Sequence, residues 1–133
     1  MMQKLFPAKF AAVALLVAMA LLQVFHILTL LGLMPQSMVW SGIVIQDKNN
    51  FYLLEGTAIA LNLAFSVVVV ARAGWLRSGR VGMVAIVGTW MAFGGFVLIA
   101  LGNIVLGVTI ENWFSVPLPF VLALVALRLA LEP

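Results

Sequence analysis

Apolar residues run along this chain in four long stretches that are separated by short, more polar segments. A helix of about 20 mostly apolar residues can cross the hydrocarbon core of a bilayer, and each stretch is close to or above that length. The strands of a membrane barrel would be about ten residues long with alternating polarity, a pattern that this chain lacks. The pattern therefore predicts an all-α fold, a transmembrane bundle of four helices. The expected spans are Ala8–Met34, Phe51–Arg72, Val81–Gly107 and Trp113–Leu131.

The composition supports a membrane location. Hydrophobic residues make up 65% of the 133 residues, charged residues make up 8%, and the mean hydropathy is +1.25. An ordinary soluble domain contains about 25% charged residues. A chain of this length has no room for a soluble domain beside four spans, so we expect a single integral membrane domain over residues 1–133.

The first apolar stretch has some features of a secretory signal. Lys4 and Lys9 precede it, and the Ala-Met-Ala sequence at residues 18–20 resembles a signal-peptidase site. The apolar sequence continues to Met34, however, which is well beyond the apolar region of a signal peptide. We therefore expect an uncleaved first span.

Lysine and arginine are distributed unevenly about the expected spans. If the spans alternate in direction, Lys48 lies on one side of the membrane and the other cations lie on the opposite side. Because cytoplasmic loops are enriched in Lys and Arg, this bias predicts that both termini are cytoplasmic. The bias and the lack of cysteine are compatible with a bacterial inner membrane, which is the expected location. The cations on the cytoplasmic side are Lys4, Lys9, Arg72, Arg77, Arg80 and Arg128.

No cofactor, metal-binding residue or catalytic residue is expected. The chain has no cysteine, which excludes disulfides and thiolate metal sites, and one histidine cannot form a histidine-rich metal centre. The formal charge is +3, but the cations lie at the ends of spans rather than on one face, so nucleic acid is not an expected partner. The expected partners are the lipid bilayer, a small-molecule or lipid ligand, and a second copy of the chain or another membrane protein.

The outer loop between the first two spans, Pro35 to Asn50, is longer and more apolar than the other connections. Residues 38–45, which include Trp40, are too apolar for a solvated loop. We expect this loop either to lie in the membrane interface or to fold back over the bundle as a lid. Pro35 ends the first helix because it has no N–H to donate, and Asn50 is expected to cap the second helix.

A few strongly polar side chains interrupt the spans, where they are costly and usually face the interior of a bundle. Gln23 and His26 are three residues apart and share a helix face. Glu55 and Asn62 are seven residues apart and also share a face. Such residues can simply form hydrogen bonds between helices, at about 0.6 kcal/mol each on average, and a first-turn carboxylate can be wetted by the interface. The candidate ligand-binding residues are His26, Trp40, Glu55, Asn62 and Asn103.

The helical rise of about 1.5 Å per residue gives a depth for each polar residue. Measured from the outer ends of the expected spans, Gln23, His26 and Asn62 lie roughly 12–16 Å deep, whereas Glu55 and Asn103 lie about 6 Å deep, under the outer loop. Side chains lean toward the N-terminus of their helix, which carries Glu55 outward and His26 inward. Direct contact between Glu55 and His26 is therefore not expected unless a water bridges them or a helix boundary is shifted.

Residues 26–42 carry a short pattern, H-x5-G-x2-P-x3-V-W-x-G. This pattern resembles that of a group of small four-span bacterial membrane proteins without an assigned function. Glu55, Asn62 and Asn103, together with the closing residues 128–132, also lie where that group places them. The resemblance covers most of the chain and implies a four-helix membrane fold, but it implies no particular activity.

Three kinds of function are compatible with these features. The first is a protein that binds or transports a small or lipid-like ligand through an outward-facing intramembrane polar pocket. The alternative is a structural or accessory subunit, which would pack with other membrane proteins or with itself through the small residues Gly88, Ala92 and Gly95 of the third span. A membrane enzyme is the weakest candidate, because no nucleophile–base pair or phosphate loop has a recognisable spacing. A cavity of about 300 Å³ or more near Glu55 would favour ligand binding, and a Glu55 directed to bulk water would favour the structural role.

Overall fold

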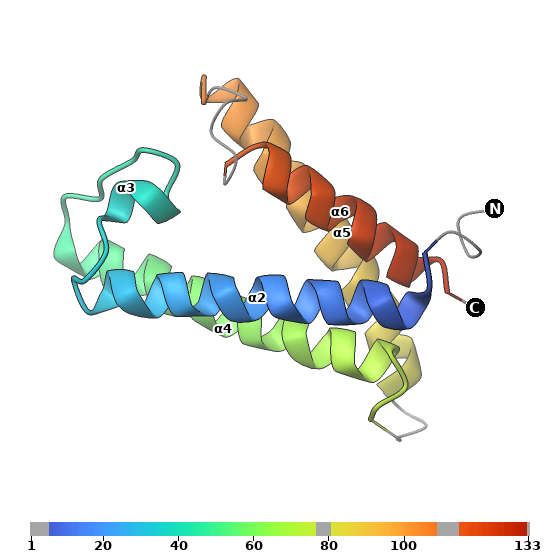
Figure 1. Ribbon diagram of the computed structural model, residues 1–133. Coiled ribbons are helices and arrows are strands. Elements are labelled where there is room, and N and C mark those ends of the chain that lie inside the picture. The colour runs from blue at the N-terminus through green and yellow to red at the C-terminus, as the bar shows by residue number, and fades with distance from the viewer. Residues whose placement is uncertain (1–5, 77–80, 109–114, 133) are drawn as a thin grey trace.

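Helices are the only regular secondary structure in the residues that this computed structural model describes, which are 6–76, 81–108 and 115–132 (Figure 1). The prediction of an all-α chain is confirmed. In chain order, the helices are α2 (Ala8–Leu30), α3 (Gln36–Val39), α4 (Lys48–Arg72), α5 (Val81–Val105) and α6 (Pro117–Ala130).

Three of these helices are long and apolar enough to cross a membrane, namely Ala8–Leu30, Lys48–Arg72 and Gly82–Val105. The fourth apolar helix, α6, has 14 residues. At about 1.5 Å per residue it is about 21 Å long, which is shorter than the hydrocarbon core of about 30 Å. The start of the expected fourth span, at Trp113, lies outside the described residues.

Both helix ends that face the outer loop differ from the predicted boundaries. The first helix ends at Leu30 rather than Met34, because Gly32 adopts a φ of +72° and the N–H of Leu33 bonds the carbonyl of Leu28, as in a Schellman motif. The second helix begins at Lys48 rather than Phe51. Its cap is Asp47, whose carboxylate accepts a 2.7 Å hydrogen bond from the backbone N–H of Asn50, so the assignment of the cap to Asn50 was wrong. The connection between α2 and α4 therefore covers residues 31–47 rather than the expected 35–50.

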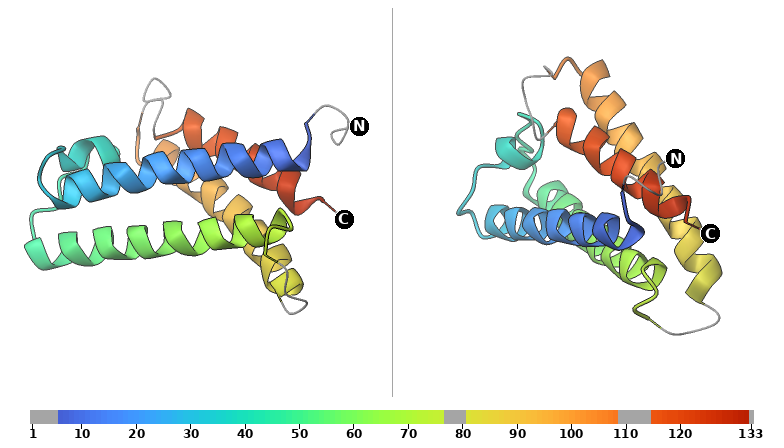
Figure 2. Two further views of the ribbon diagram at one scale, coloured as in Figure 1. Left: turned by 60° about the horizontal axis from the view of Figure 1, so that its bottom comes forward. Right: turned by 45° about the vertical axis from the view of Figure 1, so that its right-hand side comes forward.

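The long helices form two antiparallel pairs that meet at one end of the molecule and diverge at the other, where α3 lies (Figures 1 and 2). One pair is α2 with α4, and the other is α5 with α6. Near the meeting end, buried side chains from all four helices form one apolar core. The members of this core are Ala12, Leu15, Met19, Val69, Ala92, Leu122, Ala126 and Leu129.

Two arginines join the pairs at the meeting end. Arg72, the last residue of α4, donates to the main-chain carbonyl of Leu129 in the last turn of α6 at 3.3 Å and to that of Glu132 just beyond this helix. Arg128 donates from Nε to the carbonyl of Phe6 at 2.7 Å and forms a 2.7 Å ion pair with the Glu132 carboxylate. The last carbonyls of a helix have no partner within it, and a cation is favourable there. The two guanidinium groups therefore fix the pairs to each other where they converge.

Gly88 is the described glycine at which two helices, α4 and α5, approach each other most closely. A Cβ atom added to Gly88 would lie 2.7 Å from the Val68 side chain, so Gly88→Ala is expected to lower the free energy of unfolding by about 1–3 kcal/mol. Reversible unfolding in mixed micelles measures the change. Gly95→Ala is the control, since it lies in the same helix with no atom within 4 Å of an added Cβ. Val68→Ala should restore stability in the Gly88→Ala background, and equal stability of the Gly88→Ala and Gly95→Ala variants would refute this packing.

Candidate functional site

A cavity of 590 Å³ lies between the two helix pairs, on the side where they diverge. All four long helices, together with α3 and the loop after it, contribute to its lining. The lining is mostly apolar, and none of the described lining residues is Asp, Glu, Lys or Arg. The polar residues among them are His26, Trp40, Ser41, Thr57, Asn62 and Asn103.

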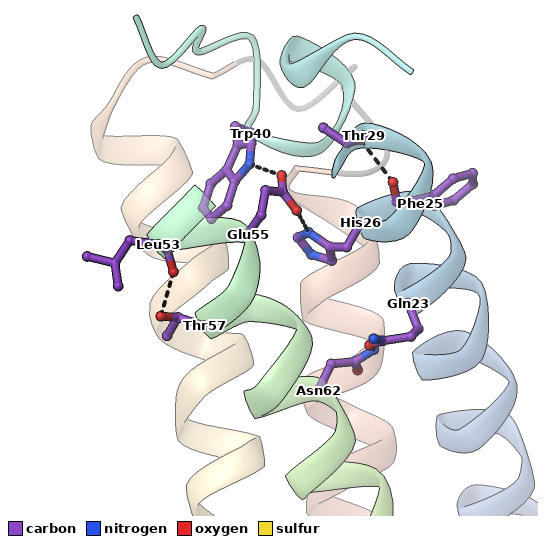
Figure 3. A network of polar contacts seen from close by, with 9 residues as sticks. All are labelled: Gln23, Phe25, His26, Thr29, Trp40, Leu53, Glu55, Thr57 and Asn62. Carbon is purple, nitrogen blue, oxygen red and sulfur yellow. Dashed lines mark hydrogen bonds and ion pairs between the residues drawn. The ribbon is translucent and has the colours of Figure 1, made fainter. Parts of the chain in front are cut away.

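A buried histidine–carboxylate pair stands at the wall of this cavity. His26 Nδ1 of α2 lies 2.7 Å from Glu55 Oε2 of α4, and the two residues are 6% and 0% exposed, respectively. Figure 3 shows Glu55 pointing from α4 toward the imidazole ring. Glu55 is not among the lining residues, so it holds His26 from behind while the imidazole ring itself faces the cavity.

Trp40 completes the surroundings of Glu55. Its indole Nε1–H donates to Glu55 Oε1 at 2.6 Å, so each carboxylate oxygen has its own partner (Figure 3). The Trp40 and His26 rings also meet edge to face, with their centroids 6.0 Å apart. The three side chains thus form one connected cluster that joins α2, α4 and the outer loop.

The outer loop brings Trp40 to this position by a compact local fold. The N–H of Trp40 closes α3 on the carbonyl of Gln36 at 2.9 Å, and the Gln36 side-chain oxygen accepts the N–H of Ile45 at 2.8 Å. Ser41 and Gly42 have positive φ angles of 54° and 88°, which turn the chain back sharply. The loop therefore folds back far enough for its tryptophan to reach a carboxylate on α4.

The contact between His26 and Glu55 contradicts the separation that the depth estimate predicted. The error lies in the helix boundaries, because α2 ends four residues after His26 and α4 begins seven residues before Glu55. At about 1.5 Å per residue, His26 is about 6 Å and Glu55 about 10 Å from the helix ends that the α2–α4 connection joins, so the two residues lie at similar levels. The shifted boundaries close the gap without a bridging water.

A second polar contact lies further along the same two helices. Asn62 Nδ2 donates to Gln23 Oε1 at 2.7 Å and to the carbonyl of Met19 at 2.8 Å. Asn62 lines the cavity, whereas no hydrogen bond joins it to His26 among the described residues. Gln23 and Asn62 therefore form a deeper level of their own, and His26 belongs to the upper level with Glu55 (Figure 3).

Asn103 lies on a different wall of the cavity. It belongs to α5, and its Nδ2 donates to the carbonyl of Ser115, just before α6. Asn103 and Glu55 were expected at the same depth, under the outer loop. No hydrogen bond joins the two among the described residues, because the Asn103 hydrogen bond runs to the segment before α6. Asn103 still lines the cavity, so four of the five candidate residues face it and Glu55 lies behind His26.

Several lining residues were not selected from the sequence. Ala58 and Phe96 have no polar chemistry of their own, and only their helical spacing from Glu55, Asn62 and Asn103 puts them on the same faces. Thr57 and Ser41 are polar lining residues that sequence analysis did not select. Thr57 donates to the Leu53 carbonyl at 2.7 Å, which is how a hydroxyl is commonly satisfied within a membrane helix.

Comparisons with known proteins found no match. No protein-family model matches the chain, and no significant similarity to a curated protein or to a solved structure was found. The function is therefore inferred from the contacts, the burial and the charge of the site's own residues.

Proposed function

We propose that this chain is a multi-pass membrane protein that binds or transports a small or lipid-like ligand in the cavity beside His26. The observation that carries this proposal is a 590 Å³ cavity with a buried, carboxylate-held imidazole in its wall. Ligand sites commonly measure about 300–1,000 Å³ and combine an apolar lining with a few placed polar groups. Glu55 is fully buried and does not point to bulk water, which also favours ligand binding over a structural role.

The accessory-subunit alternative has less support because the small residues on which it depends pack inside the chain. Gly88 lies against Val68 of α4, and Ala92 is a member of the apolar core. Gly95 is the member of the set with open space beside it. This face of α5 is thus largely occupied by the protein itself.

Catalysis is the other alternative with less support, although Glu55 and His26 are in direct contact and could together transfer a proton. No second titratable residue lines the cavity beside His26 in the described part of the chain. Proton transfer to a ligand would have to use this pair alone.

The proposed setting is a cell membrane, with a bacterial inner membrane as the expected source. The Lys and Arg bias favours cytoplasmic termini, and in that orientation the meeting end of the helix pairs faces inward. The cavity then opens toward the outer half of the bilayer, beneath the loop that carries Trp40. In this orientation the four apolar helices act as one bundle, with Trp40 and its loop as a lid.

Native mass spectrometry tests the function directly. Wild-type protein purified from its source membrane is expected to retain a small molecule or lipid at a defined stoichiometry. Ala58→Phe places a phenyl ring in the cavity and is expected to weaken ligand binding about tenfold, or about 1.4 kcal/mol of affinity, which lowers the bound fraction. Ala20→Phe is the control, because Ala20 is an exposed residue of α2 outside the lining. Equal occupancy in the two variants, or an empty wild-type protein, would count against ligand binding in this cavity.

A further inference from the structure

The surroundings of Glu55 determine the charge of the buried pair. The described groups that contact its carboxylate are His26 and Trp40, and an indole N–H can only donate. Neither Lys nor Arg forms an ion pair with Glu55 in the described part of the chain. An uncompensated carboxylate inside an apolar protein is very costly, which favours a Glu55–His26 pair that is electrically neutral as a unit.

A neutral pair has two possible arrangements, and both lead to the same surface on the cavity. In the first, a carboxylate faces an imidazolium, whose two nitrogens both carry hydrogen. In the second, a protonated Glu55 donates to Nδ1 of a neutral His26, and the imidazole hydrogen is then on Nε2. His26 Nε2 has no hydrogen-bond partner among the described residues, and the ring lines the cavity. The pair therefore presents an N–H donor there.

Most other donors at the cavity wall are already used within the protein. The indole N–H of Trp40 is bonded to Glu55, and both amide hydrogens of Asn62 have acceptors. The Thr57 hydroxyl donates to a carbonyl of its own helix. A ligand that enters the cavity thus meets His26 Nε2–H as a donor held by a buried partner, and the second amide hydrogen of Asn103 lies on a different wall.

We propose that the cavity selects an uncharged amphiphile whose polar group is a hydrogen-bond acceptor, such as the carbonyl of a ketone or an ester, and that His26 Nε2–H donates to it. This inference rests on the proposed ligand-binding function and adds the class of ligand. A charged ligand would lack a counter-charge, since the described lining holds no Asp, Glu, Lys or Arg and the charge of His26 is balanced by Glu55 within the pair. The apolar lining accommodates the hydrocarbon part.

Binding of 2-undecanone to protein in nanodiscs of ether phospholipid tests the proposal. With a carbon-13 carbonyl, the bound ketone is expected to show a stretch at lower frequency than the ketone in empty nanodiscs. His26→Phe is expected to abolish this shift and to weaken ketone binding about tenfold, the effect of one neutral hydrogen bond in a dry site. Undecane, which has no acceptor, should bind both proteins equally. An unshifted carbonyl in the bound wild-type protein, or equal ketone affinity in the two proteins, overturns the proposal.

Glu55→Gln gives a second test, because it keeps a side chain of the same size and hydrogen-bonding ability at position 55. Trp40 donates to the glutamine oxygen, which leaves the glutamine NH₂ to donate to His26 Nδ1 and the imidazole hydrogen on Nε2. Because the donor stays on Nε2, ketone affinity is expected to remain above that of His26→Phe and not to exceed that of the wild type. An increase of about tenfold in this variant would show that Nε2 is an acceptor in the wild-type protein and would overturn the proposal.

The same measurements separate the proposal from the function on which it rests. If neither undecane nor the ketone binds, and the native protein is empty, the ligand-binding function itself fails. If both bind equally and His26→Phe has no effect, the function stands and the ligand class is wrong. Repeating the ketone titration in ester phospholipid identifies the source of the carbonyl. Weaker ketone binding there indicates competition from the acyl esters of membrane lipids, and equal binding indicates a free amphiphile.

Discussion

Glu55→Ala is expected to lower the free energy of unfolding by about 2–6 kcal/mol, the largest effect of any single substitution at the site. The change leaves the half-buried Trp40 indole N–H and the buried His26 Nδ1 without a partner, at up to about 1–3 kcal/mol for each group. Trp40 then has no anchor on α4, so amide exchange in residues 36–45 is expected to accelerate as well. Reversible unfolding in mixed micelles gives the stability, and hydrogen exchange gives the state of the loop.

Glu55→Gln is the matched control for this substitution, because glutamine keeps one acceptor for Trp40 and one donor for His26. Its loss of stability should be clearly smaller than that of Glu55→Ala. If the two variants unfold alike and the loop exchanges as in the wild type, Glu55 does not hold His26 and Trp40 together as described.

Arg72→Leu is expected to lower the free energy of unfolding by about 2–3 kcal/mol, since hydrogen bonds to charged groups are among the strong ones. The guanidinium donates to the carbonyls of Leu129 and Ala130 in the last turn of α6 and to that of Glu132 just beyond it, where a cation is favourable. The substitution removes both this cap and the link from α4 to α6, so the α5–α6 pair should separate from the α2–α4 pair first. Unfolding in mixed micelles, followed by residue-specific hydrogen exchange, measures both effects.

Two controls define the role of Arg72. Arg72→Lys retains the charge at the end of α6 but loses the forked donor geometry, so it should fall between the wild type and Arg72→Leu. Lys9→Leu removes an exposed cation of α2 and should change stability little. Identical results for Arg72→Leu and Lys9→Leu would mean that the helix pairs are joined by the apolar core alone.

The existence of the helices follows from hydropathy, but their ends do not. Residues 31–34 are mostly apolar and continue the hydrophobic stretch, so only the backbone of Gly32, with its positive φ, shows that α2 has ended. At the start of α4, Asp47 and Asn50 are both plausible caps, and the choice depends on which side chain reaches a free N–H. Shifts of three or four residues at these two ends were enough to misplace His26 relative to Glu55.

The candidate residues were identifiable by type, whereas their partners were not. His26 and Glu55 stand out because ionisable side chains in apolar spans are costly and rare. Their pairing joins residues 29 positions apart, and the Trp40 contact depends on a loop whose turn at Ser41 and Gly42 has no helical periodicity to follow. The cavity arises from the divergence of two helix pairs, which is a property of packing over the whole chain.

Nitrogen-15 NMR of the imidazole ring tests the central claim most directly, because His26 is the only histidine in the chain and needs no assignment. With protein labelled at histidine and reconstituted in ether-lipid nanodiscs, Nε2 is expected to carry a hydrogen, and its resonance should move when 2-undecanone is added. Glu55→Gln should leave Nε2 protonated while the Nδ1 resonance changes. A bare Nε2 in the wild-type protein, or an Nε2 resonance that saturating ketone leaves unmoved, would contradict a cavity in which Glu55 holds His26 as the donor to a ligand.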